Sequence, residues 1–122
     1  MKKISSDPIP EELKDISSDL VSKFDAAWNG RDANALAKLL TEDADFRLYH
    51  GILVRGRKKI KRFYRDKVFP YLEEGLCHVT RKYRVRSLTN DVVIGDGRVD
   101  LVIIEDGEEK DVKKRLKVTT VV

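Results

Sequence analysis

The stretch that decides the fold is LCHVTRKYRVRSLTNDVVIGDGRVDLVII, residues 76–104. Apolar and polar residues alternate through its two halves, as is typical of β-strands, and Asn90-Asp91 between them is a turn signal. A second turn signal, Asp106-Gly107, precedes a further alternating run from Val112 to Val122. The sequence therefore predicts three long antiparallel strands in the second half of the chain.

The strand that ends at Ile104 is apolar on both faces. By alternation, Val92, Ile94, Val102 and Ile104 share one face, and Val93, Val99, Leu101 and Ile103 share the other. A strand that is apolar on both faces is covered on both. One layer of helices covers only one of them, so we expect a homodimer formed through the outer face of the sheet.

Working outward, the N-terminal part of the chain predicts helices. Pro8 and Pro10 precede a helix whose apolar stripe recurs every three or four residues and ends at Gly30. The stripe consists of Leu13, Ile16, Leu20, Phe24, Ala27 and Trp28. Asp32 is placed to cap a second, short helix that runs to Leu40.

A hairpin and a third helix follow. Phe46 to Val54 reads as two short strands with Gly51 in the turn. Gly56 opens the third helix, Pro70 kinks or ends it, and Gly75 closes it. The whole chain, 1–122, is expected to be one α+β domain.

Composition limits the class of protein. Hydrophobic residues make up 41% of the chain and charged residues 38%, and Gln is absent. This high charge favours a protein from a thermophile. We find neither an apolar segment of membrane-spanning length nor a signal peptide, so we expect a cytoplasmic location. The single Cys77 has no partner for an internal disulfide and is interpreted as a small buried residue.

Positive charge is concentrated in the middle of the chain, where residues 55–67 carry eight basic side chains and one Asp. On a helix, the basic residues form an outward face, and the neighbouring aromatic residues point inward. A solvated surface is the favoured interpretation, because no aromatic stacking platform accompanies the charge. Nucleic acid is therefore not the expected partner, although a basic interaction module for nucleic acid or an acidic partner stays the third hypothesis.

Four segments together resemble the nuclear transport factor two-like (SnoaL-like) superfamily, most closely its SgcJ/EcaC-type branch. They are FDAAWNGRD (Phe24–Asp32), LLTEDADF (Leu39–Phe46), GILVRGRKKI (Gly51–Ile60) and the strand pair after His78. The resemblance implies a cystatin-like cone, in which a curved antiparallel sheet wraps around three N-terminal helices. Members of this branch usually continue past Leu116–Val122 with a final strand, so that strand is expected to be missing here.

The resemblance also allows catalytic roles to be tested on this sequence. In ketosteroid isomerase, the tyrosine donor and the carboxylate base would fall on Phe24 and Leu48, neither of which handles protons. Limonene epoxide hydrolase uses an Arg-x-Asp pair, and Arg98 and Asp100 match that half of its site. A second carboxylate has no match, so the alternative is an ordinary surface ion pair.

Histidines and aromatic residues complete the candidate site. His50 is a candidate acid or base near neutral pH, with a rim histidine as the favoured alternative, and His78 has a weaker claim. A ligand pocket lined by Phe24, Trp28, Phe46, Leu48 and Phe63 is expected, although the same residues equally suit a filled core. The spacing of His and carboxylates matches no metal site, and no cofactor is expected.

The leading hypothesis is a dimeric domain that binds a small organic molecule and has no assigned activity. The runner-up is a hydrolase- or cyclase-like enzyme that uses Asp100 with Arg98 or His50. Because one fold serves many functions, the choice rests on the site itself.

Overall fold

The computed structural model describes residues 11–48, 51–89 and 92–121. Its helices are α1 (Glu11–Asn29), α2 (Ala33–Lys38) and α3 (Arg57–Phe63). A π-helical turn (Tyr64–Val68) and a 3₁₀ turn (Phe69–Tyr71) extend α3 and end just after Pro70, which cannot continue a helix. The predicted three-helix order is therefore confirmed.

Five strands form two antiparallel sheets among the described residues. The small one pairs β1 (Asp45–Arg47) with β2 (Leu53–Arg55). The large one has the order β3 (Leu76–Ser87), β4 (Val93–Glu105), β5 (Glu108–Val121). Bulges interrupt the register between Thr80 and Lys82 on β3 and at two positions along the β4–β5 ladder. Such bulges bend a sheet and increase its twist.

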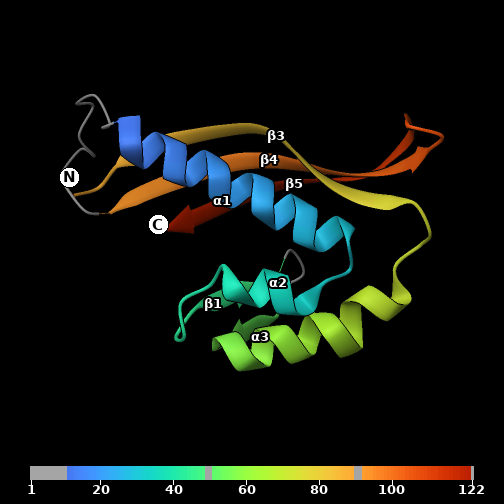
Figure 1. Ribbon diagram of the computed structural model, residues 1–122, viewed down its shortest axis with the longest axis horizontal. Helices are drawn as coiled ribbons and strands as arrows, with labels where there is room; N and C mark the ends of the chain where they lie inside the picture. Colours follow the sequence, from blue (N-terminus) through green and yellow to red (C-terminus); the bar gives the residue numbers. More distant parts are fainter. Residues whose placement is uncertain (1–10, 49–50, 90–91, 122) are drawn as a thin grey trace.

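Helix α1 lies across one face of the large sheet, and α2, α3 and the β1–β2 hairpin are grouped beside it (Figure 1). Buried apolar residues pack between these groups and form one core cluster. They include Trp28, Leu36, Ile60, Tyr64 and Phe69. The α+β class and the order of helices followed by an antiparallel sheet are as the sequence predicts.

The apolar stripe of α1 is buried only in its C-terminal half. Ala27 and Trp28 are buried, but Ile16 is 49% exposed, contrary to the prediction from the stripe. Ser17, one position further along the helix, is fully buried instead. The N-terminal turns of α1 extend past the group formed by α2, α3 and the hairpin (Figure 1).

The two faces of β4 differ more than their apolar residues suggest. The face towards α1 carries Val93, Val99 and Ile103, all buried. The outer face carries Asp96, Arg98 and Asp100 in its centre, with its apolar residues confined to the two ends. The homodimer through this face stays a prediction, and any partner there would meet charged residues first.

Candidate functional site

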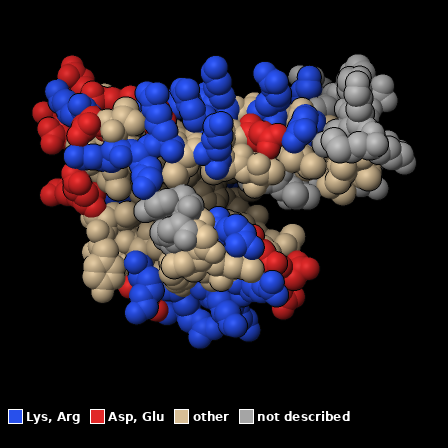
Figure 2. All heavy atoms as spheres, turned by 180° about the vertical axis from the view of Figure 1, so that it is seen from behind, with Lys and Arg blue, Asp and Glu red and all other residues tan. Residues whose placement is uncertain are grey.

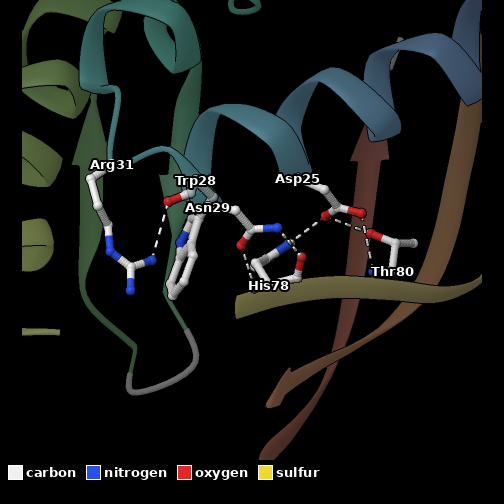
Figure 3. Close-up of polar contacts among 6 residues, drawn as sticks. All are labelled: Asp25, Trp28, Asn29, Arg31, His78 and Thr80. Atoms are coloured by element: carbon white, nitrogen blue, oxygen red, sulfur yellow. Dashed lines mark hydrogen bonds and ion pairs between the residues drawn. The ribbon is translucent and has the colours of Figure 1, made fainter. Parts of the chain in front are cut away.

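A group of polar side chains joins α1 to β3 (Figure 3). The Asp25 carboxylate on α1 lies 2.6 Å from the His78 Nδ1 atom on β3. It also accepts hydrogen bonds from the Thr80 amide at 3.1 Å and the Thr80 hydroxyl at 3.0 Å. His78 and Thr80 are two positions apart on one strand, so both point at the same face of α1.

Asn29, one helical turn after Asp25, holds the backbone of His78. Its side-chain oxygen accepts from the His78 amide at 2.7 Å, and its side-chain nitrogen donates to the His78 carbonyl at 3.2 Å. This bidentate contact resembles one step of a β-ladder. It fixes the position of the imidazole on the strand, while Asp25 fixes the direction of the ring.

These contacts also indicate which ring nitrogen of the neutral imidazole carries the hydrogen. An ionised carboxylate only accepts hydrogen bonds, and Asp25 already accepts two from Thr80. His78 therefore donates its Nδ1–H to Asp25, which leaves the lone pair of the neutral ring on Nε2. The His78 side chain retains 12% of its exposure, so the ring is largely enclosed.

Two aromatic rings lie close to this imidazole. The Phe24 centroid is 5.3 Å and the Trp28 centroid 5.4 Å from that of His78. Together with other rings they form a closed circuit, in which successive centroids are 5.3–6.1 Å apart. We call it the aromatic circuit, and its members are Phe24, Phe46, Tyr64, Phe69, Trp28 and His78.

Two members of the circuit have a distinct electrostatic setting. Burial raises the pKa of the Tyr64 phenol to about 12, so this group stays neutral at physiological pH. The Arg31 guanidinium lies 5.0 Å from the Trp28 ring centre and donates to the Leu76 carbonyl at 2.8 Å. Arg31 thus closes the end of the α1–β3 contact with a cation on an indole face.

The structure brings together three of the five residues predicted to line a pocket. Phe24, Trp28 and Phe46 belong to the aromatic circuit, and Trp28 is buried, as its place on the stripe predicts. Phe63 packs on Tyr64 from outside the circuit and lines a separate depression of about 280 Å³ with Val54. Leu48 is half-buried at the end of the β1–β2 hairpin, where its amide donates to the Ile52 carbonyl.

Asp100 and Arg98 lie on the outer face of β4, away from α1. Asp100 is 3% exposed, and its carboxylate accepts from Arg81 Nε at 3.2 Å, with Arg115 Nε at 3.6 Å. The expected pairing of Arg98 with Asp100 is wrong. Residues i and i+2 of a strand are about 6.7 Å apart, whereas residues on neighbouring strands come closer. Arg115, opposite Asp100 on β5, and Arg81, in the bulge of β3, therefore take that place.

The structure describes one of the two candidate histidines. His50 lies outside the described residues. His78 had the weaker claim from sequence, yet it forms the centre of the polar group. The spacing of Asp25 and Asn29 by one helical turn, and of His78 and Thr80 by two strand positions, was a signal that each pair shares a face.

Within residues 11–48, 51–89 and 92–121, no three His, Cys, Asp or Glu side chains are grouped as a metal site would need. No helix of the described chain is long and apolar enough to span a membrane.

Comparison with known proteins confirms the fold. No family model and no curated protein matches the sequence. A protein of unknown function with a cystatin-like fold from Nostoc punctiforme superposes with a TM-score of 0.77 at 12% identity, over 94% of this chain and 82% of that one. An NTF2-like protein with a cystatin-like fold from Novosphingobium aromaticivorans superposes with a TM-score of 0.67 at 15% identity, over 91% of this chain and 77% of that one.

A third structure, a proposed scytalone dehydratase from Novosphingobium aromaticivorans, has a TM-score of 0.62 at 17% identity, over 89% of this chain and 84% of that one. At such identities, the similarities establish the cystatin-like, NTF2-like fold and leave activity open. The fold that the SnoaL-like resemblance implied is thus confirmed, and the SgcJ/EcaC-type branch stays a prediction.

Proposed function

We propose that this protein binds a small aromatic or alicyclic molecule beside His78, and that the His78–Asp25 pair exchanges a proton with it. The observation that carries the proposal is the imidazole held at 2.6 Å by Asp25 beside two aromatic rings. Flat apolar walls with a few fixed polar groups are typical of small-molecule sites.

The geometry supports general-base chemistry at Nε2. Asp25 takes the Nδ1–H bond, so the free nitrogen of the neutral ring is the one that accepts a proton from a bound C–H or O–H group. The resulting imidazolium is stabilised by the adjacent carboxylate. Returning the proton to another atom of the same molecule completes an isomerisation or an elimination, with no net consumption of the base.

The name of one structural neighbour is consistent with this proposal. A dehydratase removes water by taking a proton and protonating a leaving hydroxyl, which is chemistry of the same kind. The neighbour's name refers to that protein, and here it supports only the choice of reaction class.

The earlier alternative, an enzyme that uses Asp100 with Arg98 or His50, stays a prediction. Asp100 is bound by arginines of the outer sheet face, whereas His78 lies on the helix side of the sheet, so the two candidate sites are distinct. Variants of one leave the other intact, which makes the two hypotheses separable.

The test uses 2-tetralone, a bicyclic ketone with acidic C–H bonds, as a probe. Binding is followed by the single tryptophan indole N–H signal in ¹⁵N-labelled protein, because Trp28 borders His78. Proton abstraction is followed as exchange of the C–H bonds for deuterium in D₂O. We expect the protein to accelerate exchange and His78→Gln to reduce that acceleration by about 10²–10⁴-fold, the usual contribution of a general base.

Phe63→Leu is the matched control, since it alters an aromatic residue outside the circuit. Equal exchange rates for the wild type and His78→Gln would remove the acid–base part of the proposal. A Trp28 signal that does not respond to saturating probe would remove the binding part for molecules of this class.

A further inference from the structure

The outer face of the β3–β4–β5 sheet carries a row of three cations side by side. Register places Lys82 of β3 opposite Arg98 of β4, and Arg98 opposite Lys117 of β5. Like charges directly opposite one another destabilise a sheet. A row of this kind conflicts with local stability, and such conflicts are typical of functional surfaces.

Acidic residues on the same face do not neutralise this row. Asp96 accepts from Arg86 at 2.6 Å and from the Thr119 hydroxyl at 2.8 Å. Asp100 accepts a hydrogen bond from Arg81, which also donates to Glu109 at 2.6 Å. The available carboxylates are therefore already bound, and none contacts the row.

Four cations on this face have no ion-pair partner among the described residues: Lys82, Arg84, Arg98 and Lys117. The Arg98 Nε atom is buried without an acceptor. Figure 2 shows Lys and Arg side chains along this face, while acidic residues gather at one end of it. That end holds the β4–β5 hairpin, which contains Glu105, Asp106 and Glu108.

We infer that this face, which we call the basic sheet face, binds the phosphate backbone of a nucleic-acid duplex without reading its sequence, and that it is not the homodimer surface expected from the amino-acid sequence. Charge complementarity is the main argument: along a strand the cations repeat about every 6.7 Å, and across the sheet about every 4.8 Å, which presents several of them to one polyanion. The acidic β4–β5 hairpin would repel phosphates, so it limits the length of duplex that this face contacts at that end.

The face favours a duplex over a single strand. Single-strand sites combine positive charge with aromatic stacking platforms. Tyr83 pairs with Gly97 and its ring lies against Gly95, which places it on the helix side of the sheet. Among the described residues of β3, β4 and β5, no other aromatic ring than those of Tyr83 and His78 is present, and both face away from the basic sheet face.

The experiment measures binding of the full chain to a fluorescein-labelled 24-bp DNA duplex of arbitrary sequence by anisotropy, with an RNA duplex of equal length in parallel. Four free cations predict a slope of log K against log salt near −3.6, about −0.9 for each neutralised phosphate. Lys82→Thr combined with Lys117→Thr should halve that slope, because two of the four contacts are lost. Both side chains are exposed and threonine suits a strand, so folding should persist, as circular dichroism would show.

Lys58→Gln combined with Lys59→Gln is the control, because it removes the same charge from α3. The inference is supported if only the sheet variant lowers the slope, and DNA or RNA is then assigned by whichever duplex binds more tightly. It is overturned if both variants behave alike or neither duplex binds at 50 mM salt. Binding only to vesicles of anionic lipid, or a dimer that the sheet variant dissociates, would also overturn it by giving the face another occupant.

Discussion

The carboxylate of Asp25 and the imidazole of His78, 53 positions apart in the sequence, meet at 2.6 Å and join helix α1 to strand β3. Two further hydrogen bonds from Thr80 reach the same carboxylate. One acidic side chain therefore anchors the helix to the sheet as well as orienting the candidate base, and its two roles are separable by experiment.

Replacing Asp25 by Ala should destabilise the protein by about 1–3 kcal/mol, because it leaves three donors of β3 without their acceptor in a half-buried contact. Asp19→Ala is the matched control on the same helix. The Asp19 side chain is 61% exposed and pairs only with Lys23, 62% exposed, so its loss should cost below about 0.5 kcal/mol. Urea unfolding curves give both values. Equal losses for the two variants would contradict the anchoring role.

High pH should unfold the protein in part through Tyr64. Its pKa is raised to about 12 in the folded state by burial, while the unfolded chain has the ordinary value near 10. Below pH 10 the phenol is neutral in both states. From pH 10 to 12 only the unfolded state releases the proton, so stability falls over this window.

Absorbance at 295 nm, followed against pH, measures this ionisation. In the wild type, part of the tyrosine signal should be delayed to the unfolding transition, and Tyr64→Phe should remove that delayed part. Tyr71 is 79% exposed, so Tyr71→Phe is the control and should leave the delayed part of the signal unchanged. If Tyr64→Phe removed early signal as well, its phenol would not be buried.

Gly95 is required by the ring of Tyr83. A Cβ at position 95 would clash with the ring and hydroxyl of Tyr83, so the ring would have to move. Gly95→Ala should cost about 1–3 kcal/mol, the usual range for overpacking. In the double variant Gly95→Ala/Tyr83→Val the loss should be less than the sum of the single losses, because the clash is absent. Thermal unfolding of the four proteins completes the cycle, and additive losses would argue against this contact.

The sequence predicts local features of this molecule more fully than contacts between elements. Asp32 was expected to cap the second helix, and its carboxylate accepts from the Ala35 amide at 2.9 Å. Gly30 and Gly56 flank helices as expected. These features depend on a few neighbouring residues, whose preferences are read directly from the chain.

The candidate site was not predicted because it depends on which strand face meets α1. Alternation shows that His78 and Thr80 share a face, and that Arg98 and Asp100 share another, but both faces of β4 carry apolar residues. The bulge at Thr80–Lys82 then adds Arg81, which reaches Asp100 from the neighbouring strand. A single sequence shows neither which face of the strands packs against α1 nor where the bulge lies.

The last prediction concerns the arginine that holds Asp100. This carboxylate is 3% exposed, and Arg81 is the only residue in the described chain that donates a hydrogen bond to it at 3.5 Å or less, Arg115 being 3.6 Å away. Arg81→Leu should therefore cost about 3 kcal/mol, because the buried carboxylate loses its hydrogen-bond donor and keeps only the longer contact with Arg115. Arg86→Leu on the same face is the control: both partners of the Arg86–Asp96 pair are about 40% exposed, so its loss should stay below about 1 kcal/mol. Adding Asp100→Val to Arg81→Leu should restore much of the stability, since the double variant no longer buries the carboxylate of residue 100. Chemical unfolding of the single and double variants measures this coupling, and a double variant less stable than Arg81→Leu alone would show that Asp100 stabilises the sheet by other contacts.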